Sequence, residues 1–134
     1  QLGCVHRFIS KGHSPMKNTL NFFELPVVDM ARATAFYEQL LGGTIRHEVV
    51  DDEPNGILPF EEPGVGGALV LRKGFAPGNG ALIYLNVNGD LEGAAERAVQ
   101  AGGSIVLPPT PPYPFGRIAV IVDSEGNHVG LHSD

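Results

Sequence analysis

The sequence contains little cysteine and little positive charge. Cys4 is the single cysteine among 134 residues, so no disulfide can form within the chain. A chain of this kind suits a reducing compartment, and we expect a cytoplasmic protein. Nine lysines and arginines stand against fifteen aspartates and glutamates, which gives a formal net charge of −6 at pH 7. Nucleic-acid binding requires a basic surface, so we expect no nucleic acid as a partner.

Long apolar segments are lacking as well. A membrane helix needs about 20 consecutive apolar residues, and the apolar runs of this sequence are far shorter. No basic-then-apolar pattern opens the sequence, so we expect neither a signal segment nor a membrane partner. Residues 1–18 show no clear period, and we expect a flexible N-terminal tail there. Residues 19–134 have the length of one domain.

The domain contains an internal repeat with a period of 60 residues. The stretch GGTI begins at Gly42 and returns as GGSI at Gly102. The same offset pairs further identical residues: Leu25 with Leu85, Val27 with Val87, Ala35 with Ala95, Pro54 with Pro114, Gly66 with Gly126 and Leu71 with Leu131. Two copies predict two similar modules, 19–73 and 80–133, because a solenoid would need at least three.

Each module shows the same order of secondary-structure signals. A β-type run is followed by a helical stretch that starts after Asp29 or Asp90 and stops at a glycine. Three short extended runs come next, and the polar segment 123–127 is predicted to be the turn between the last two. One helix can cover only one face of a four-stranded sheet. We therefore predict an α+β fold of two βαβββ modules with a shared concave cavity, in which a small-molecule ligand would bind.

Two motifs are similar to those of a known family. One is D-x-x-R-A-x-x-F-Y, from Asp29 to Tyr37, and the other is D-x-E-G-N-x-x-G-L, from Asp123 to Leu131. With these motifs, residues 19–133 resemble the vicinal-oxygen-chelate superfamily, which comprises glyoxalases, bleomycin resistance proteins and extradiol dioxygenases. The resemblance implies a glyoxalase/bleomycin resistance/dihydroxybiphenyl dioxygenase-like fold and a homodimer.

The resemblance also implies where a metal would bind, and the sequence departs from the family there. In metal-dependent relatives the first and last strands of each module supply the ligands. The matching positions are occupied by Phe22, Val70, Leu82 and Gly130. Divalent metals require imidazole, carboxylate or thiolate donors, and these four residues offer none. We therefore expect no metal and no cofactor at this site, and extradiol dioxygenase activity is not expected.

Alternation along the strands predicts which side chains face the cavity, because residues two apart share a face of the sheet. The candidate ligand-binding residues on the strands are Phe22, Glu24, Val70, Leu82, Tyr84, Asn86, His128 and His132. Tyr113 and Phe115 belong to a proline-rich loop at 108–116 that would hold their rings rigidly over the ligand. This mixture suits an organic ligand with a few hydrogen-bonding groups. The glycines at 64–67 lack the spacing of a phosphate-binding loop.

Glu24 is the candidate catalytic residue. A carboxylate on an otherwise apolar strand could have a raised pKa and act as a general base; alternatively, it is paired with an arginine or a lysine. His128 and His132 would lie about 13 Å apart on an extended strand, too far to share one ion. A displaced metal site at Glu24 and His132 remains open.

The sequence leaves three functions open. We expect metal-independent binding of a small organic molecule, in the manner that the resemblance to bleomycin resistance proteins implies. The alternative is a glyoxalase-like lyase or isomerase that uses a displaced metal, or Glu24 as acid and base. A third possibility is a subunit-interaction module whose groove is filled by side chains. The sequence names neither the ligand nor a reaction.

Overall fold

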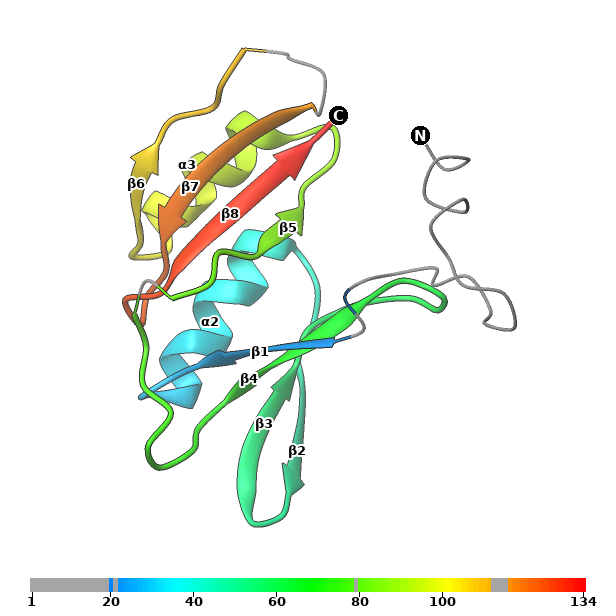
Figure 1. Ribbon diagram of the computed structural model, residues 1–134, viewed down its shortest axis with the longest axis vertical. Coiled ribbons are helices and arrows are strands. Elements are labelled where there is room, and N and C mark those ends of the chain that lie inside the picture. The colour runs from blue at the N-terminus through cyan, green and yellow to red at the C-terminus, as the bar shows by residue number, and fades with distance from the viewer. Residues whose placement is uncertain (1–19, 21, 79, 112–115) are drawn as a thin grey trace, which may run out of the picture.

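Two four-stranded sheets and two helices form the described part of the chain (Figure 1). The structure is a computed structural model that describes residue 20 and residues 22–78, 80–111 and 116–134. The predicted tail at residues 1–18 lies outside the described residues, as do Tyr113 and Phe115.

The two modules have the same element order, so the predicted α+β fold of two βαβββ modules is confirmed. The first module contains β1 (Phe22–Pro26), α2 (Met30–Leu41), β2 (Arg46–Val50), β3 (Glu53–Ile57) and β4 (Gly66–Val70). The second contains β5 (Tyr84–Asn86), α3 (Leu91–Gln100), β6 (Ser104–Leu107), β7 (Arg117–Val122) and β8 (His128–Ser133). The strand orders are β1-β4-β3-β2 and β5-β8-β7-β6. In each sheet the first strand runs parallel to the last strand of its module, and the remaining pairs are antiparallel.

Both helices begin and end near the predicted positions, but their starts differ. The side chain of Asp29 caps α2 by accepting a hydrogen bond from the backbone N–H of Arg32 at 3.0 Å, and Gly42 ends the helix with φ 76°. Asp90 precedes α3 without such a bond, because its carboxylate binds Arg97 at 2.7 Å instead. Neither helix of the described residues is long and apolar enough to cross a membrane.

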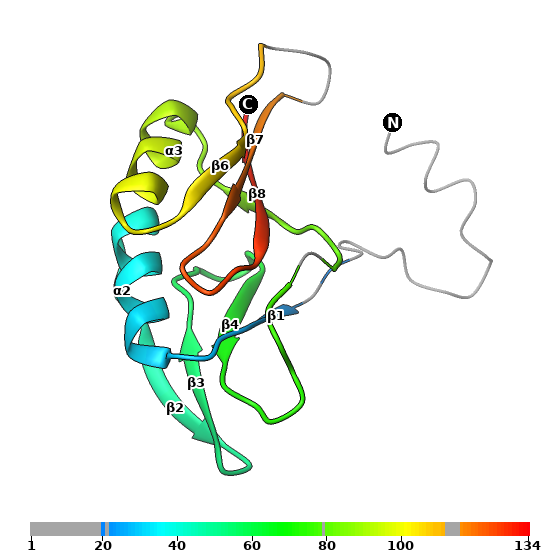
Figure 2. The same ribbon diagram turned by 90° about the vertical axis from the view of Figure 1, so that its left-hand side faces the viewer.

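A single hydrophobic core connects the modules. Both helices lie on the same side of the two sheets (Figure 2), and α2 packs against α3. The strand residues that point toward the helices, such as Leu25 and Leu85, are buried, whereas their neighbours Glu24 and Tyr84 are exposed on the opposite side. The alternation therefore leaves one side of each sheet without a covering helix.

The two family-like motifs bind one another across the modules. Glu125 has a fully buried side chain. Its carboxylate accepts hydrogen bonds from the backbone N–H groups of Val28 at 2.8 Å and Asp29 at 2.9 Å, and from Arg32 Nε at 2.6 Å. The carboxylate thus lies at the N-terminus of α2, where the helix dipole favours a negative charge. Burial acts to raise the pKa of Glu125, but these hydrogen bonds outweigh it and hold the pKa below its ordinary value.

The polar turn at 123–127 is confirmed, and its side chains Asp123, Glu125 and Asn127 are buried. Asp123 accepts hydrogen bonds from the backbone N–H groups of Glu125 and Asn127 through Oδ1, and from the hydroxyl of Tyr37 at 2.5 Å through Oδ2. The side-chain amide of Asn127 donates to the carbonyl of Pro26 at 2.8 Å and to Asp123 Oδ2 at 3.0 Å. Every buried polar group of this turn therefore has a partner, as its burial requires.

The hydrogen bond between Tyr37 and Asp123 predicts an alkaline instability. Burial and the neighbouring carboxylate of Asp123 raise the pKa of Tyr37 well above its ordinary value of 10.0. The unfolded phenol ionises first, so the stabilisation is complete below about pH 10 and declines as the pH rises further. We expect Tyr37→Phe to lose about 2 kcal/mol at pH 7, because Asp123 loses a donor, and to show a shallower decline above pH 10. Chemical unfolding at a series of pH values measures both effects.

Tyr84→Phe is the matched control for this prediction, because the Tyr84 side chain is 48% exposed. It should keep both the stability at pH 7 and the full alkaline decline. Identical pH profiles for Tyr37→Phe and the unchanged protein would contradict a role for this hydrogen bond.

Because the pKa of Glu125 is lowered, we predict that this residue makes the protein less stable at acidic pH, in contrast to the alkaline effect of Tyr37. The pKa of Glu125 is lowered by folding, so its contribution is present above the ordinary glutamate pKa and is lost as the pH falls through the lowered value. Glu125→Gln should melt several degrees lower at pH 7 and lose less stability between about pH 5 and pH 3. Glu96→Gln, on the exposed side of α3, should leave the pH profile unchanged. If Glu125→Gln loses as much stability at acidic pH as the unchanged protein does, then other carboxylates cause that loss.

Candidate functional site

The inner edges of the two sheets border two cavities. β1 pairs only with β4, and β5 pairs only with β8, so neither strand is hydrogen-bonded to the other sheet. We call the region between β1 and β5 the seam. Cavity A has a volume of about 460 Å³ and is bounded by residues 58–61, 64–67 and 83–86 together with Leu20, Phe23 and Leu41. Cavity B has a volume of about 280 Å³ and is bounded by residues 24–26, by part of the linker between the modules, and by Asn127 and His128.

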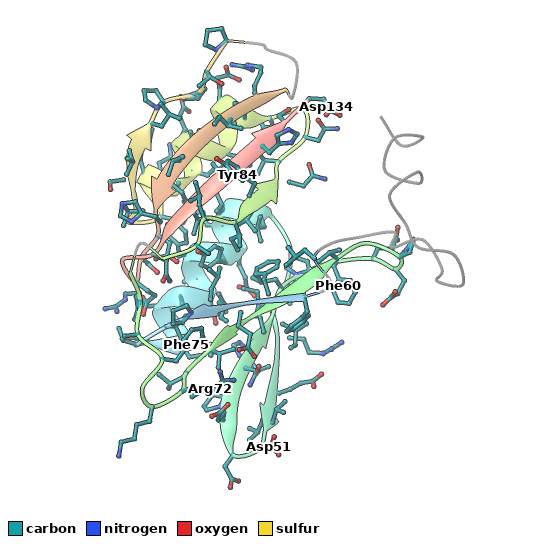
Figure 3. The ribbon with its side chains drawn as sticks, viewed as in Figure 1. Asp51, Phe60, Arg72, Phe75, Tyr84 and Asp134 are labelled. Atoms are coloured by element: carbon teal, nitrogen blue, oxygen red, sulfur yellow. The ribbon has the colours of Figure 1, made fainter. Side chains whose placement is uncertain are left out.

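Cavity A enters the molecule between the sheets. Phe23 and Leu85 reach it from the side of the sheets that faces the helices, whereas Tyr84 and Asn86 reach it from the open side. Figure 3 shows Phe60 and Tyr84 approaching this region from the first and the second module, while Arg72 and Phe75 lie near the other end of β4. The lining combines three aromatic rings, one of which is the tyrosine Tyr84, with two further polar side chains, Glu61 and Asn86.

Glycines hold the aromatic rings of cavity A in place. A Cβ atom added to Gly66 would lie 2.6 Å from the ring of Phe60, and one added to Gly67 would lie 2.6 Å from the ring of Phe23. The ring of Tyr84 covers Gly130 on the neighbouring strand in the same manner. A glycine within a strand allows such a close approach, which any other residue would prevent. Tyr84 and Phe60 stay half-exposed, at 48% and 47%, so their free faces are available to a ligand.

Cavity B contains the candidate catalytic residue in an ion-paired state. Both oxygens of Glu24 accept hydrogen bonds from Arg72, at 3.1 and 3.3 Å, and Arg72 Nε donates to Glu53 at 2.8 Å. The guanidinium also lies 5.4 Å from the centre of the Phe75 ring. The structure therefore shows the pairing with an arginine that the sequence left open. Arg72 thus takes up one acceptor site on each oxygen of Glu24.

The predicted site residues are distributed over both cavities. Tyr84 and Asn86 line cavity A, whereas Glu24 and His128 line cavity B. Phe22 and Leu82 are exposed to 50% and 40% and line neither. Their roles stay predictions.

Three further positions lie on the last strands of the modules. Val70 is fully buried, and the imidazole of His132 lies beside Gly116. His128 lines cavity B, and its buried Nδ1 has no hydrogen-bond partner among the described residues. The second module is not an exact copy here, since Val70 pairs with Pro26 but Gly130 pairs with Tyr84.

This strand register changes which residue of β8 is equivalent to Val70 of β4. The repeat equates Pro26 with Asn86, and Asn86 pairs with His132. His132, rather than Gly130, therefore occupies the place in the second sheet that Val70 has in the first. The register thus differs by two residues from the 60-residue offset.

The family metal does not fit this donor set. Phe22, Val70, Leu82 and Gly130 carry no side-chain donor for a divalent cation, and the register adds one donor, the imidazole of His132. Within the described ranges, no three histidine, cysteine, aspartate or glutamate side chains are arranged to hold a metal ion.

Sequence reasoning missed most of the residues that line cavity A, among them Phe23, Phe60 and Glu61. Phe23 packs against the core on the helix side of β1, and Phe60 and Glu61 lie in the loop after β3. The paired glycines Gly66 and Gly67 were an available signal, because glycine inside a strand indicates a close neighbour. Alternation could not reveal a cavity that passes between two sheets.

Known proteins share both the sequence pattern and the fold. The model of the Glyoxalase/Bleomycin resistance protein/Dioxygenase superfamily matches residues 19–131. A glyoxalase/bleomycin resistance protein from Catenulispora acidiphila DSM 44928 is 26% identical with a TM-score of 0.60, over 87% of this chain and 99% of that one. A glyoxalase/bleomycin resistance protein from Albidiferax ferrireducens T118 is 15% identical with a TM-score of 0.66, over 87% and 99%.

A larger enzyme also contains the fold. Glyoxalase I from Zea mays is 26% identical with a TM-score of 0.65, over 85% of this chain but 45% of that protein. Among curated proteins, no match to this chain is found. The match of the family model over most of the sequence, together with the two βαβββ modules, shows that the chain belongs to the glyoxalase/bleomycin resistance protein/dioxygenase superfamily.

Proposed function

We propose that the chain binds a small organic molecule in cavity A without the help of a metal ion. The observation that carries this proposal is that three aromatic rings, each packed against a glycine, line a cavity of about 460 Å³. Ligand cavities typically measure about 300–1,000 Å³ and combine apolar walls with a few polar groups. Cavity A has that size and that composition.

Two half-exposed rings supply the main contact surface. Tyr84 comes from β5 and Phe60 from the loop that precedes β4, so a ligand between them would touch both modules. Aromatic rings offer a large apolar area at a low entropic cost, and Tyr84 adds a hydroxyl group. Asn86 also lines the cavity, and its amide Oδ1 accepts a hydrogen bond from the N–H of Asn88 at 2.9 Å, so Nδ2 is the group with which this side chain would donate to a ligand.

Binding fits this site better than metal-assisted catalysis does. The similar structures include proteins described as glyoxalase/bleomycin resistance proteins and one described as glyoxalase I. The positions that would hold the metal offer at most one donor side chain, His132, which supports the metal-independent branch of this range. Acid–base catalysis by Glu24 has less support, because Arg72 occupies both of its oxygens.

Truncation of the rings should weaken ligand binding. We expect Tyr84→Ala and Phe60→Ala each to raise the Kd of the uncharged fluorescent probe N-phenyl-1-naphthylamine about tenfold, through loss of stacking area. A fluorescence titration measures the Kd. Phe75→Ala is the matched control, because its ring lies at cavity B, and it should leave the Kd unchanged. A larger loss in Phe75→Ala than in Tyr84→Ala would place the ligand in cavity B, and absence of any probe binding would remove the proposal.

A further inference from the structure

Among the described residues that line cavity A, none carries a positive charge. Glu61 is the one carboxylic acid in this described lining, which includes neither lysine nor arginine. Tyr84 and Asn86 are its other polar side chains. An anionic ligand would therefore enter an apolar space next to a carboxylate. Such a ligand would lose its hydration without gaining a counter-charge, which is costly.

The arginines of the described residues are already engaged elsewhere. Each of the five forms an ion pair with an acidic residue: Arg32 with Glu125, Arg46 with Glu48, Arg72 with Glu24 and Glu53, Arg97 with Asp90, and Arg117 with Glu92. None of them lines cavity A. To recruit one, an anionic ligand would have to break an existing pair and move the side chain.

The surroundings of the cavity favour positive charge. Residues 20–134 carry all fifteen acidic residues of the chain but six of its nine lysines and arginines. Glu61 and Glu62 are both exposed in the loop that leads from β3 to β4. The faces of the Phe60 and Tyr84 rings attract cations through their quadrupoles. The carboxylate of Glu61 and the two ring faces therefore all favour a positively charged group on the ligand.

We infer that the ligand of cavity A is an aromatic molecule that is uncharged or carries a positive charge, with its cationic group directed toward Glu61. This inference rests on the proposed function and adds the chemical class of the ligand. The aromatic part stacks on Tyr84 and Phe60. A hydrogen-bond acceptor of the ligand meets Nδ2 of Asn86.

Three naphthalene probes of nearly equal shape test the charge preference. Naphthalene-1-methylamine is a cation at pH 7, naphthalene-1-methanol is uncharged, and 1-naphthoate is an anion. Each competes with bound N-phenyl-1-naphthylamine in the full chain, and the inhibition constant is measured at low salt. The cation should bind about tenfold more tightly than the anion, with the alcohol between them. Added salt should reduce this difference.

Glu61→Gln identifies the charge that is responsible. The variant should weaken binding of the amine about threefold to tenfold and leave the alcohol unchanged. Glu96→Gln, an equally exposed carboxylate on α3, is the control and should change neither. Circular dichroism checks that both variants fold.

The outcomes separate the two proposals. An anion that binds as tightly as the cation, or a Glu61→Gln variant with an unchanged preference, overturns the inference on charge and leaves the binding function in place. Failure of N-phenyl-1-naphthylamine to bind overturns the proposed function and the inference together. A cation preference that disappears in Glu61→Gln supports both.

Discussion

The buried carboxylate of Glu125 connects the second module to the start of α2 in the first, and the arrangement of the two sheets depends on this contact. The carboxylate accepts two backbone hydrogen bonds and a guanidinium, while Asp123 holds the hydroxyl of Tyr37. An unpaired charge at this depth would be strongly unfavourable, so the network exists only when both modules are in place. Each half of the chain therefore supplies groups that the other half needs.

This mode of connection leaves the seam free. The modules are joined through the shared helix-side core and through the turn at 123–127, and β1 and β5 form no ladder with each other. The carbonyl of Pro26 takes its hydrogen bond from the side chain of Asn127. Because the two sheets do not merge into one, side chains from both their faces reach the same cavity.

The sequence predicted the architecture well because its signals were local or repeated. The 60-residue period, the caps at Asp29 and Gly42, and strand alternation each follow from neighbouring residues. The pairing of Glu24 with Arg72 stayed open, because it depends on how β1 and β4 align. Cavity A could not be predicted, since Phe60 lies in a loop whose path no periodic pattern defines. The two-residue difference in register between the sheets was hidden by the regularity of the repeat itself.

The Tyr84 ring packs against Gly130, so this residue of the second sheet determines how far the ring extends into cavity A. Gly130 lies behind the ring and does not line the cavity. A methyl group at this position would push the ring forward into the space that a ligand would use. Gly67 lies behind the ring of Phe23 in a similar way, although it also lines the cavity itself. A residue behind the lining, such as Gly130, would thus set the size of the molecule that fits. Ligand selectivity could change by substitution there, although the lining residues themselves stay the same.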